Sequence, residues 1–115
     1  MGINTHYYTV HGIMYPEYTD VMCEALDEKH EVLEENPDVD VITDGMCGKY
    51  TIIGKILFDS GDLRYNDIED TYVEINPAYL KMYKVKATNA FNALFPDLAH
   101  MTEGEWKIMT FMHLS

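Results

Sequence analysis

The sequence predicts an α+β domain with a mainly antiparallel sheet and two helices on one of its faces. Apolar residues alternate at period two in several short segments, as in β-strands, and recur at helical spacing in two longer ones. Hydrophobic residues make up 47% of the chain and charged residues 24%, a balance typical of globular proteins. A length of 115 residues suits one core, so we expect residues 1–115 to form a single α+β domain.

A central strand is predicted between Asp44 and Asp62. The pairs Asp44-Gly45 and Ser60-Gly61 favour a turn at each end, because glycine tolerates positive φ. The residues between them alternate between two largely apolar faces, so we expect both faces of this strand to be covered. One face carries Tyr50, Ile52, Ile56 and Phe58, and the other carries Thr51, Ile53 and Leu57.

Three further elements are predicted in the N-terminal half. Thr5–Met14 is rich in tyrosine and β-branched residues, which favours a first strand. Residues 16–35 have an amphipathic helical pattern that starts with one proline and ends before another. Asp38–Thr43 predicts a short strand, which we expect to pair with the central strand as a hairpin across residues 44–48.

The C-terminal half predicts a second helix and a last strand. Residues 71–75 favour a short edge strand, and Asn76 then caps a helix that starts at Pro77 and ends near Pro96. Residues 97–105 predict a loop and Trp106–His113 the final strand. The order strand, helix, hairpin, helix, strand resembles a ferredoxin-like α+β sandwich, a resemblance of topology that implies no function.

Apolar residues on both faces of the segments 49–58 and 106–113 do not suit a sheet with one solvated face. Three explanations stay open. Two copies of the chain pair through the uncovered face, or the segments at 62–70 or 97–105 fold over it, or the strand boundaries differ from those predicted. We predict the first of these, a homodimer or higher oligomer.

The net charge of −12 restricts the classes of partner. Residues 1–76 hold seventeen acidic side chains against four basic ones. This balance argues against direct binding to nucleic acid or to an anionic membrane, and favours a basic partner. The N-terminus lacks signal-peptide features, and Cys23 and Cys47 have no metal-ligand spacing. We therefore expect a cytoplasmic protein with reduced thiols, with a disulfide left as the alternative.

No pattern of a catalytic, cofactor or metal site is found in the sequence, so we expect no enzyme, no cofactor and no metal centre. Asp38, Asp40 and Asp44 miss the ligand spacing of a calcium loop, and the acidic segment 59–70 lacks any metal-binding signature. The five histidines lack paired ligand spacing and are expected to be isolated strand or surface residues. Cys47 has no local base partner.

The helix predicted over residues 16–35 has a strongly acidic face, which is the main functional signal. Its carboxylates are spaced at i,i+4, and each like-charge pair costs roughly 0.2–0.5 kcal/mol. Lys29, the single lysine or arginine in this segment, points toward the apolar side. The face is either an ordinary solvated helix surface or a binding site for a basic partner. The predicted partner-binding residues are Asp20, Glu24, Asp27, Glu28, Glu31, Glu34 and Glu35.

Two phrases, GKILFDSGD at 54–62 and WKIMTFMHLS at 106–115, resemble small uncharacterised proteins encoded by tailed bacteriophages. The resemblance covers most of the chain and assigns no residue a role. It implies an accessory protein directed at the host. The first hypothesis is therefore an acidic, non-enzymatic protein that inhibits a basic host protein that binds nucleic acid or acts in defence. The alternative is a small-molecule or nucleotide-sequestering protein with a pocket of Tyr, His and Lys residues between protomers.

Overall fold

The computed structural model describes residues 5–16, 20–44, 50–60 and 74–114. Four strands form one sheet in the order β2-β3-β1-β4, and each strand is antiparallel to its neighbours. The predicted α+β class, the antiparallel sheet and the pairing of β2 with β3 are thus confirmed. The strands are β1 (Thr5–Tyr15), β2 (Asp40–Thr43), β3 (Thr51–Asp59) and β4 (Lys107–Leu114).

The helices differ from the two that the sequence predicts. The segment predicted as one helix forms α1 (Asp20–Glu28) and α2 (His30–Glu35), separated at Lys29, whose φ of −112° and ψ of 21° are not helical. The second helix, α3 (Leu80–Leu94), follows a 3-10 turn at Pro77–Tyr79. Part of the predicted loop at 97–105 is also helical, because residues Pro96–Thr102 form a 3-10 segment, η3.

Local sequence signals explain where α3 begins. The side chain of Asn76 accepts a hydrogen bond from the amide of Ala78 at 3.0 Å, as expected of a capping asparagine before proline. Glu74 and Ile75, at the end of the predicted edge strand 71–75, are not in a strand. Residues 71–73 of that prediction, the hairpin turn at 45–49 and the loop at 61–70 lie outside the described residues.

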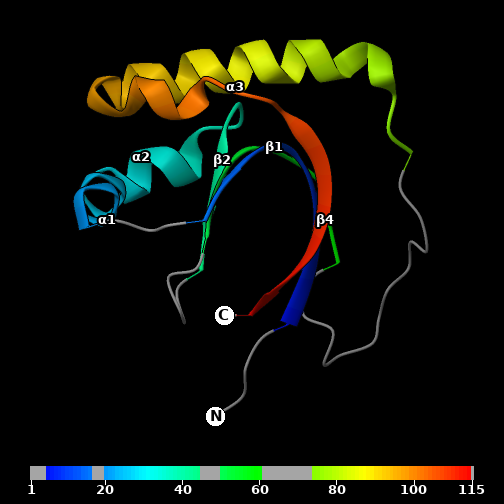
Figure 1. Ribbon diagram of the computed structural model, residues 1–115, viewed down its shortest axis with the longest axis horizontal. Helices are drawn as coiled ribbons and strands as arrows, with labels where there is room; N and C mark the ends of the chain where they lie inside the picture. Colours follow the sequence, from blue (N-terminus) through cyan, green and yellow to red (C-terminus); the bar gives the residue numbers. More distant parts are fainter. Residues whose placement is uncertain (1–4, 17–19, 45–49, 61–73, 115) are drawn as a thin grey trace.

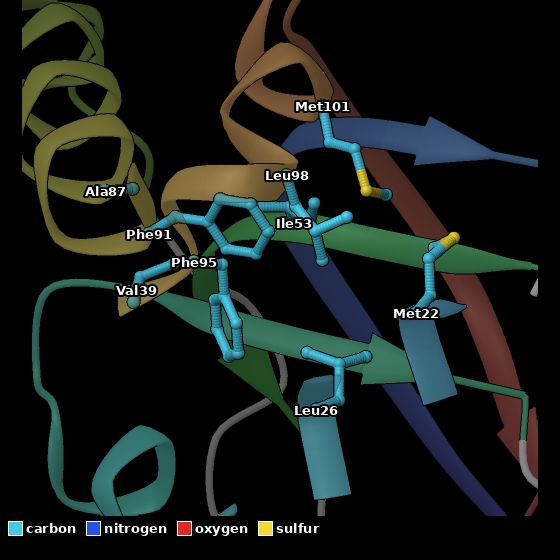
Figure 2. Close-up of a cluster of buried hydrophobic side chains, with 9 residues drawn as sticks. All are labelled: Met22, Leu26, Val39, Ile53, Ala87, Phe91, Phe95, Leu98 and Met101. Carbon is cyan, nitrogen blue, oxygen red and sulfur yellow. The ribbon is translucent and has the colours of Figure 1, made fainter. Parts of the chain in front are cut away.

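The main hydrophobic core lies between the sheet and the helices. Figure 2 shows side chains from α1, β3, α3 and η3 meeting there, with the tilted rings of Phe91 and Phe95 at a centroid distance of 5.0 Å. Ile53 of β3 is 1% exposed and Ala87 of α3 is fully buried. The buried residues of this core are Met22, Leu26, Val39, Ile53, Ala87, Phe91, Phe95, Leu98 and Met101.

A second hydrophobic cluster lies on the opposite face of the sheet, which we call the inner face. The sheet curls strongly, so that β4 and β2 bend around this face while α3 lies outside the curl (Figure 1). Val10 and Ile52 are each only 1% exposed although no described helix covers them. The cluster consists of Val10, Ile42 and Ile52 with the partly buried Tyr8, Tyr50, Ile56, Met109 and Phe111.

The curl coincides with a close approach of two strands. Gly12 of β1 pairs with Gly54 of β3. A Cβ atom on Gly54 would lie 2.2 Å from the carbonyl oxygen of His11, and one on Gly12 would lie 2.3 Å from that of Ile53. Both positions therefore require glycine, which is the residue that lets strands bend and their backbones approach.

An irregularity in β3 changes which of its side chains share a face of the strand. The register pairs Thr9 with Phe58 but Val10 with Ile56, so Leu57 is an extra residue opposite the Thr9–Val10 step. Such a β-bulge reverses the alternation of side chains beyond it. The prediction that Ile56 and Phe58 share a face is therefore wrong: Ile56 packs in the inner cluster, and Phe58 lies opposite Thr9 on the other face.

We predict that Ile53→Ala lowers the free energy of unfolding by roughly 2–5 kcal/mol, because it leaves a cavity in the main core. The control is Val85→Ala, a truncation of an α3 side chain that is 50% exposed, and it should cost less than about 1 kcal/mol. Urea denaturation measures both. Equal losses in the two variants would contradict the placement of Ile53 in the core.

Candidate functional site

The seven predicted partner-binding residues lie on α1 and α2, and all of them are exposed. We call this set the acidic surface. The break at Lys29 divides it: Glu24 and Glu28 lie one turn apart on α1, and Glu31 and Glu35 on α2. The members are Asp20, Glu24, Asp27 and Glu28 on α1 and Glu31, Glu34 and Glu35 on α2.

Lys29 does not neutralise this surface, although it is the one lysine or arginine in the helical segment. Its ammonium group donates a hydrogen bond to the carbonyl of Leu94, at the C-terminus of α3. It also lies 5.5 Å from the centre of the Phe95 ring. Both contacts are typical of a cation that stabilises a helix C-terminus and an aromatic face. The positive charge is thereby directed into the fold and away from the acidic surface.

The acidic surface also contains exposed apolar side chains. Val21 of α1 is 67% exposed and Val32 of α2 is 53% exposed. The contacts within this surface are weak ones, since His30 pairs with Glu34 at 3.1 Å in a solvent-exposed position and the half-buried thiol of Cys23 lies 3.7 Å from Asp27. Carboxylates interspersed with exposed valines can contact both the charged and the apolar parts of a partner.

A second group of candidate residues, which sequence reasoning missed, lies on the inner face. The hydroxyl of Tyr50 is 2.7 Å from Nδ1 of His113, at the end of β4. The Tyr8 ring lies between His6, at a centroid distance of 5.8 Å, and His113, at 5.6 Å. His6 in turn is 3.2 Å from a carboxylate oxygen of Asp59. The expectation of isolated histidines is therefore wrong for His6 and His113.

Burial changes the proton affinity of this group. Burial lowers the pKa of His113 below 6.5, with the nearby Asp44 acting in the opposite direction and His6 in the same one. Burial and the neighbouring carboxylate of Asp59 raise the pKa of Tyr8. At neutral pH the imidazole of His113 is therefore uncharged and the phenol of Tyr8 is protonated.

Asp40, at the start of β2, places a half-buried carboxylate beside these rings. One of its oxygens accepts a hydrogen bond of 2.7 Å from the amide of Ile56. Burial raises the pKa of Asp40, whereas that hydrogen bond and the positive charge of Lys55 oppose the rise. The ammonium of Lys55 itself donates to the carbonyl of Pro37 at 2.7 Å.

A cavity of about 410 Å³ runs along the edge of β2 and connects the two groups of residues. His30 and Glu34 of α2 line it on one side, and Tyr8 and His113 line it from the sheet. Asp40 of β2 also lines it. The volume falls in the range of small-ligand sites. The cavity thus joins the acidic surface to the aromatic inner face.

Within the described ranges, no three His, Cys, Asp or Glu side chains are placed to hold a metal ion. Cys47 and the acidic residues 61–70 lie outside those ranges. None of the helices in the described part of the chain is long and apolar enough to cross a membrane. Comparisons of the chain with protein-family models, curated proteins and solved structures find no match.

We predict that the protein loses stability as the pH falls below about 6.5. The pKa values of His11 and His113 are lowered from 6.5 in the folded state, chiefly by burial, so the unfolded chain binds protons first. Urea midpoints at pH 7.5 and 5.5 measure the loss. His113→Asn removes one titrating group and should reduce it. A pH dependence identical to that of the parent would contradict the assignment to His113.

Proposed function

We propose that the protein is a non-enzymatic binding protein whose acidic surface binds a basic protein. The observation that carries the proposal is that Lys29 is directed toward α3, so that no lysine or arginine of residues 20–35 compensates the carboxylates of α1 and α2. Repulsion between carboxylates destabilises a helix slightly, so an uncompensated face favours a use beyond solvation. Exposed Val21 and Val32 would supply apolar contacts at the same surface.

The resemblance to phage-encoded proteins suggests the kind of partner. A protein that binds nucleic acid has a basic surface, and an acidic surface complementary to it would compete with the nucleic acid. We therefore propose an accessory protein that acts in the host cytoplasm by inhibiting such a protein or a defence protein. The strand order and antiparallel pairing support assignment of the domain to the ferredoxin-like sandwich.

We predict that replacing Glu24, Glu28, Glu31 and Glu35 together with Gln abolishes binding to a basic partner captured from bacterial lysate, mainly by slowing association. Association of the parent should also weaken as salt rises. Biosensor kinetics at two salt concentrations measure both effects.

The control replaces exposed carboxylates elsewhere in the chain with Gln, at Glu74, Glu103 and Glu105. It removes three of the four charges and should retain most of the binding. If the first variant bound as tightly as the control, and salt had no effect on the parent, the acidic surface would not be the binding site.

The tyrosines and histidines on the inner face favour a second candidate function, the sequestering of a small molecule or nucleotide between protomers. Tyr8, Tyr50 and His113 offer stacking surfaces and hydrogen-bonding groups near one another. The Gln substitutions on α1 and α2 should not affect ligand sequestering. A thermal-shift screen against nucleotides separates this function from the binding of a basic protein.

We also propose that the chain forms a homodimer. The exposed apolar side chains of β4 and its neighbour support this: Ile108 and Met112 lie opposite His11 and Tyr7 on the helix side of the sheet. Strand β4 runs away from α3, so that helix does not cover this part of the sheet (Figure 1). The inner face, through which the second candidate function requires two chains to pair, supports a dimer less well, because its central residues are already buried within one chain.

Light scattering at micromolar concentration should therefore give twice the chain mass of 13.3 kDa. Replacing Ile108 and Met112 together with Glu should return the mass to that of one chain without unfolding it, because both side chains are exposed. A parent mass of 13.3 kDa would contradict the dimer.

A further inference from the structure

The chemistry of the cavity beside β2 indicates what it can bind. Two carboxylates, those of Asp40 and Glu34, line it, and none of its described lining residues is a lysine or arginine. The nearby Lys55 donates its hydrogen bond to the Pro37 carbonyl. His113 is uncharged at neutral pH because burial lowers its pKa. The cavity is therefore negative, which disfavours phosphates and favours a cation.

The uncharged side chains of the lining indicate which kind of cation would fit the cavity. Tyr8 contributes a ring held by contacts with His6, Phe111 and His113. Leu33 and Ile56 contribute apolar surface. An aromatic ring beside a carboxylate is the combination that binds a planar guanidinium, while apolar side chains pack against the methylene stem that carries it.

We propose that this cavity binds the guanidinium group of an arginine side chain presented by the basic partner. The inference rests on the proposed function, and it adds a specific anchor to a surface that otherwise attracts by charge alone. Asp40 forms the charge-assisted contact, Tyr8 lies beside the guanidinium, and Glu34 borders the entrance from α2. An arginine anchored in a pocket is a common centre of binding energy at protein interfaces.

The environment of Asp40 supports this assignment independently of the acidic surface. Its carboxylate is half-buried, and this burial raises its pKa. Its Oδ2 atom accepts a hydrogen bond from the amide of Ile56. The charge of Lys55 offsets the unfavourable burial of this carboxylate in part, and a cation placed beside it would offset that burial further.

Two small probes test the proposal on the unmodified protein. Propylguanidinium carries the charged group of arginine, and propylurea is a planar, uncharged analogue of similar size. The amide of Ile56, which donates to Asp40, is the NMR reporter. Propylguanidinium should shift this resonance with an affinity on the order of millimolar, as expected for so small a ligand, and propylurea should not. No shift with either probe, or equal binding of both, would overturn the proposal.

Two variants locate the site. Asp40→Asn keeps an acceptor for the Ile56 amide but removes the charge, and should weaken propylguanidinium binding roughly tenfold. Glu34→Gln changes an exposed residue, is expected to fold, and should also weaken binding. Glu24→Gln on α1 lies outside the cavity lining and is the matched control. Binding unchanged in Glu34→Gln and in folded Asp40→Asn would overturn the proposal, and if Asp40→Asn does not fold, Glu34→Gln and the two probes decide.

The result is separable from a failure of the proposed function. The variant with Gln at Glu24, Glu28, Glu31 and Glu35 retains every lining residue of the cavity, so it should bind propylguanidinium as the parent does. Loss of partner binding in that variant, without any propylguanidinium binding by the parent, would leave the acidic surface supported and the arginine site refuted. Propylguanidinium binding by a parent protein that binds no basic partner would support the arginine site and refute the acidic surface.

Discussion

The close approach of β1 and β3 at Gly12 and Gly54 is the constraint on which the inner face depends. Any Cβ at either position would collide with a backbone oxygen of the other strand, so the two strands could not stay at this separation. The sheet that these strands form is curled (Figure 1), and the side chains of the inner cluster pack together on its inner face. Val10 and Ile52 are each 1% exposed, and their neighbours in the inner cluster all come from the sheet strands and Tyr50.

The packing also determines where the positive charge of Lys29 lies. Its ammonium group donates to a carbonyl at the C-terminus of α3, where a cation interacts favourably with the helix dipole. The same contact joins the α1–α2 junction to the main core through Phe95. It therefore stabilises the arrangement of three helices and removes the cation from their outer surface. The acidic character of that surface follows from the fold as well as from composition.

The sequence predicts the elements of this fold better than their irregularities. Periodicity locates the four strands and α3, because the spacing of apolar residues is a local property. The break at Lys29 depends on contacts with Leu94 and Phe95, and the bulge at Leu57 on register with β1, so neither has a local signal. The acidic surface can be predicted from the sequence because its residues, like the apolar ones of a helix, are regularly spaced along the chain. The Tyr50–His113 contact cannot be predicted in this way, because it joins residues 63 positions apart through the curl of the sheet.

The position of Asp40 shows how one local feature leads to the proposed site. The register of β2 and β3 would place residue 38 opposite Ile56, but β2 begins only at Asp40. The carbonyl of Pro37 accepts a hydrogen bond from the ammonium of Lys55, and the amide of Asp38 turns back to the side chain of Asn36. The amide of Ile56 donates to the Asp40 carboxylate, which takes the place of a backbone acceptor beyond the end of β2. A shortened edge strand is therefore the reason that a negative charge is held, half-buried, at the wall of the cavity.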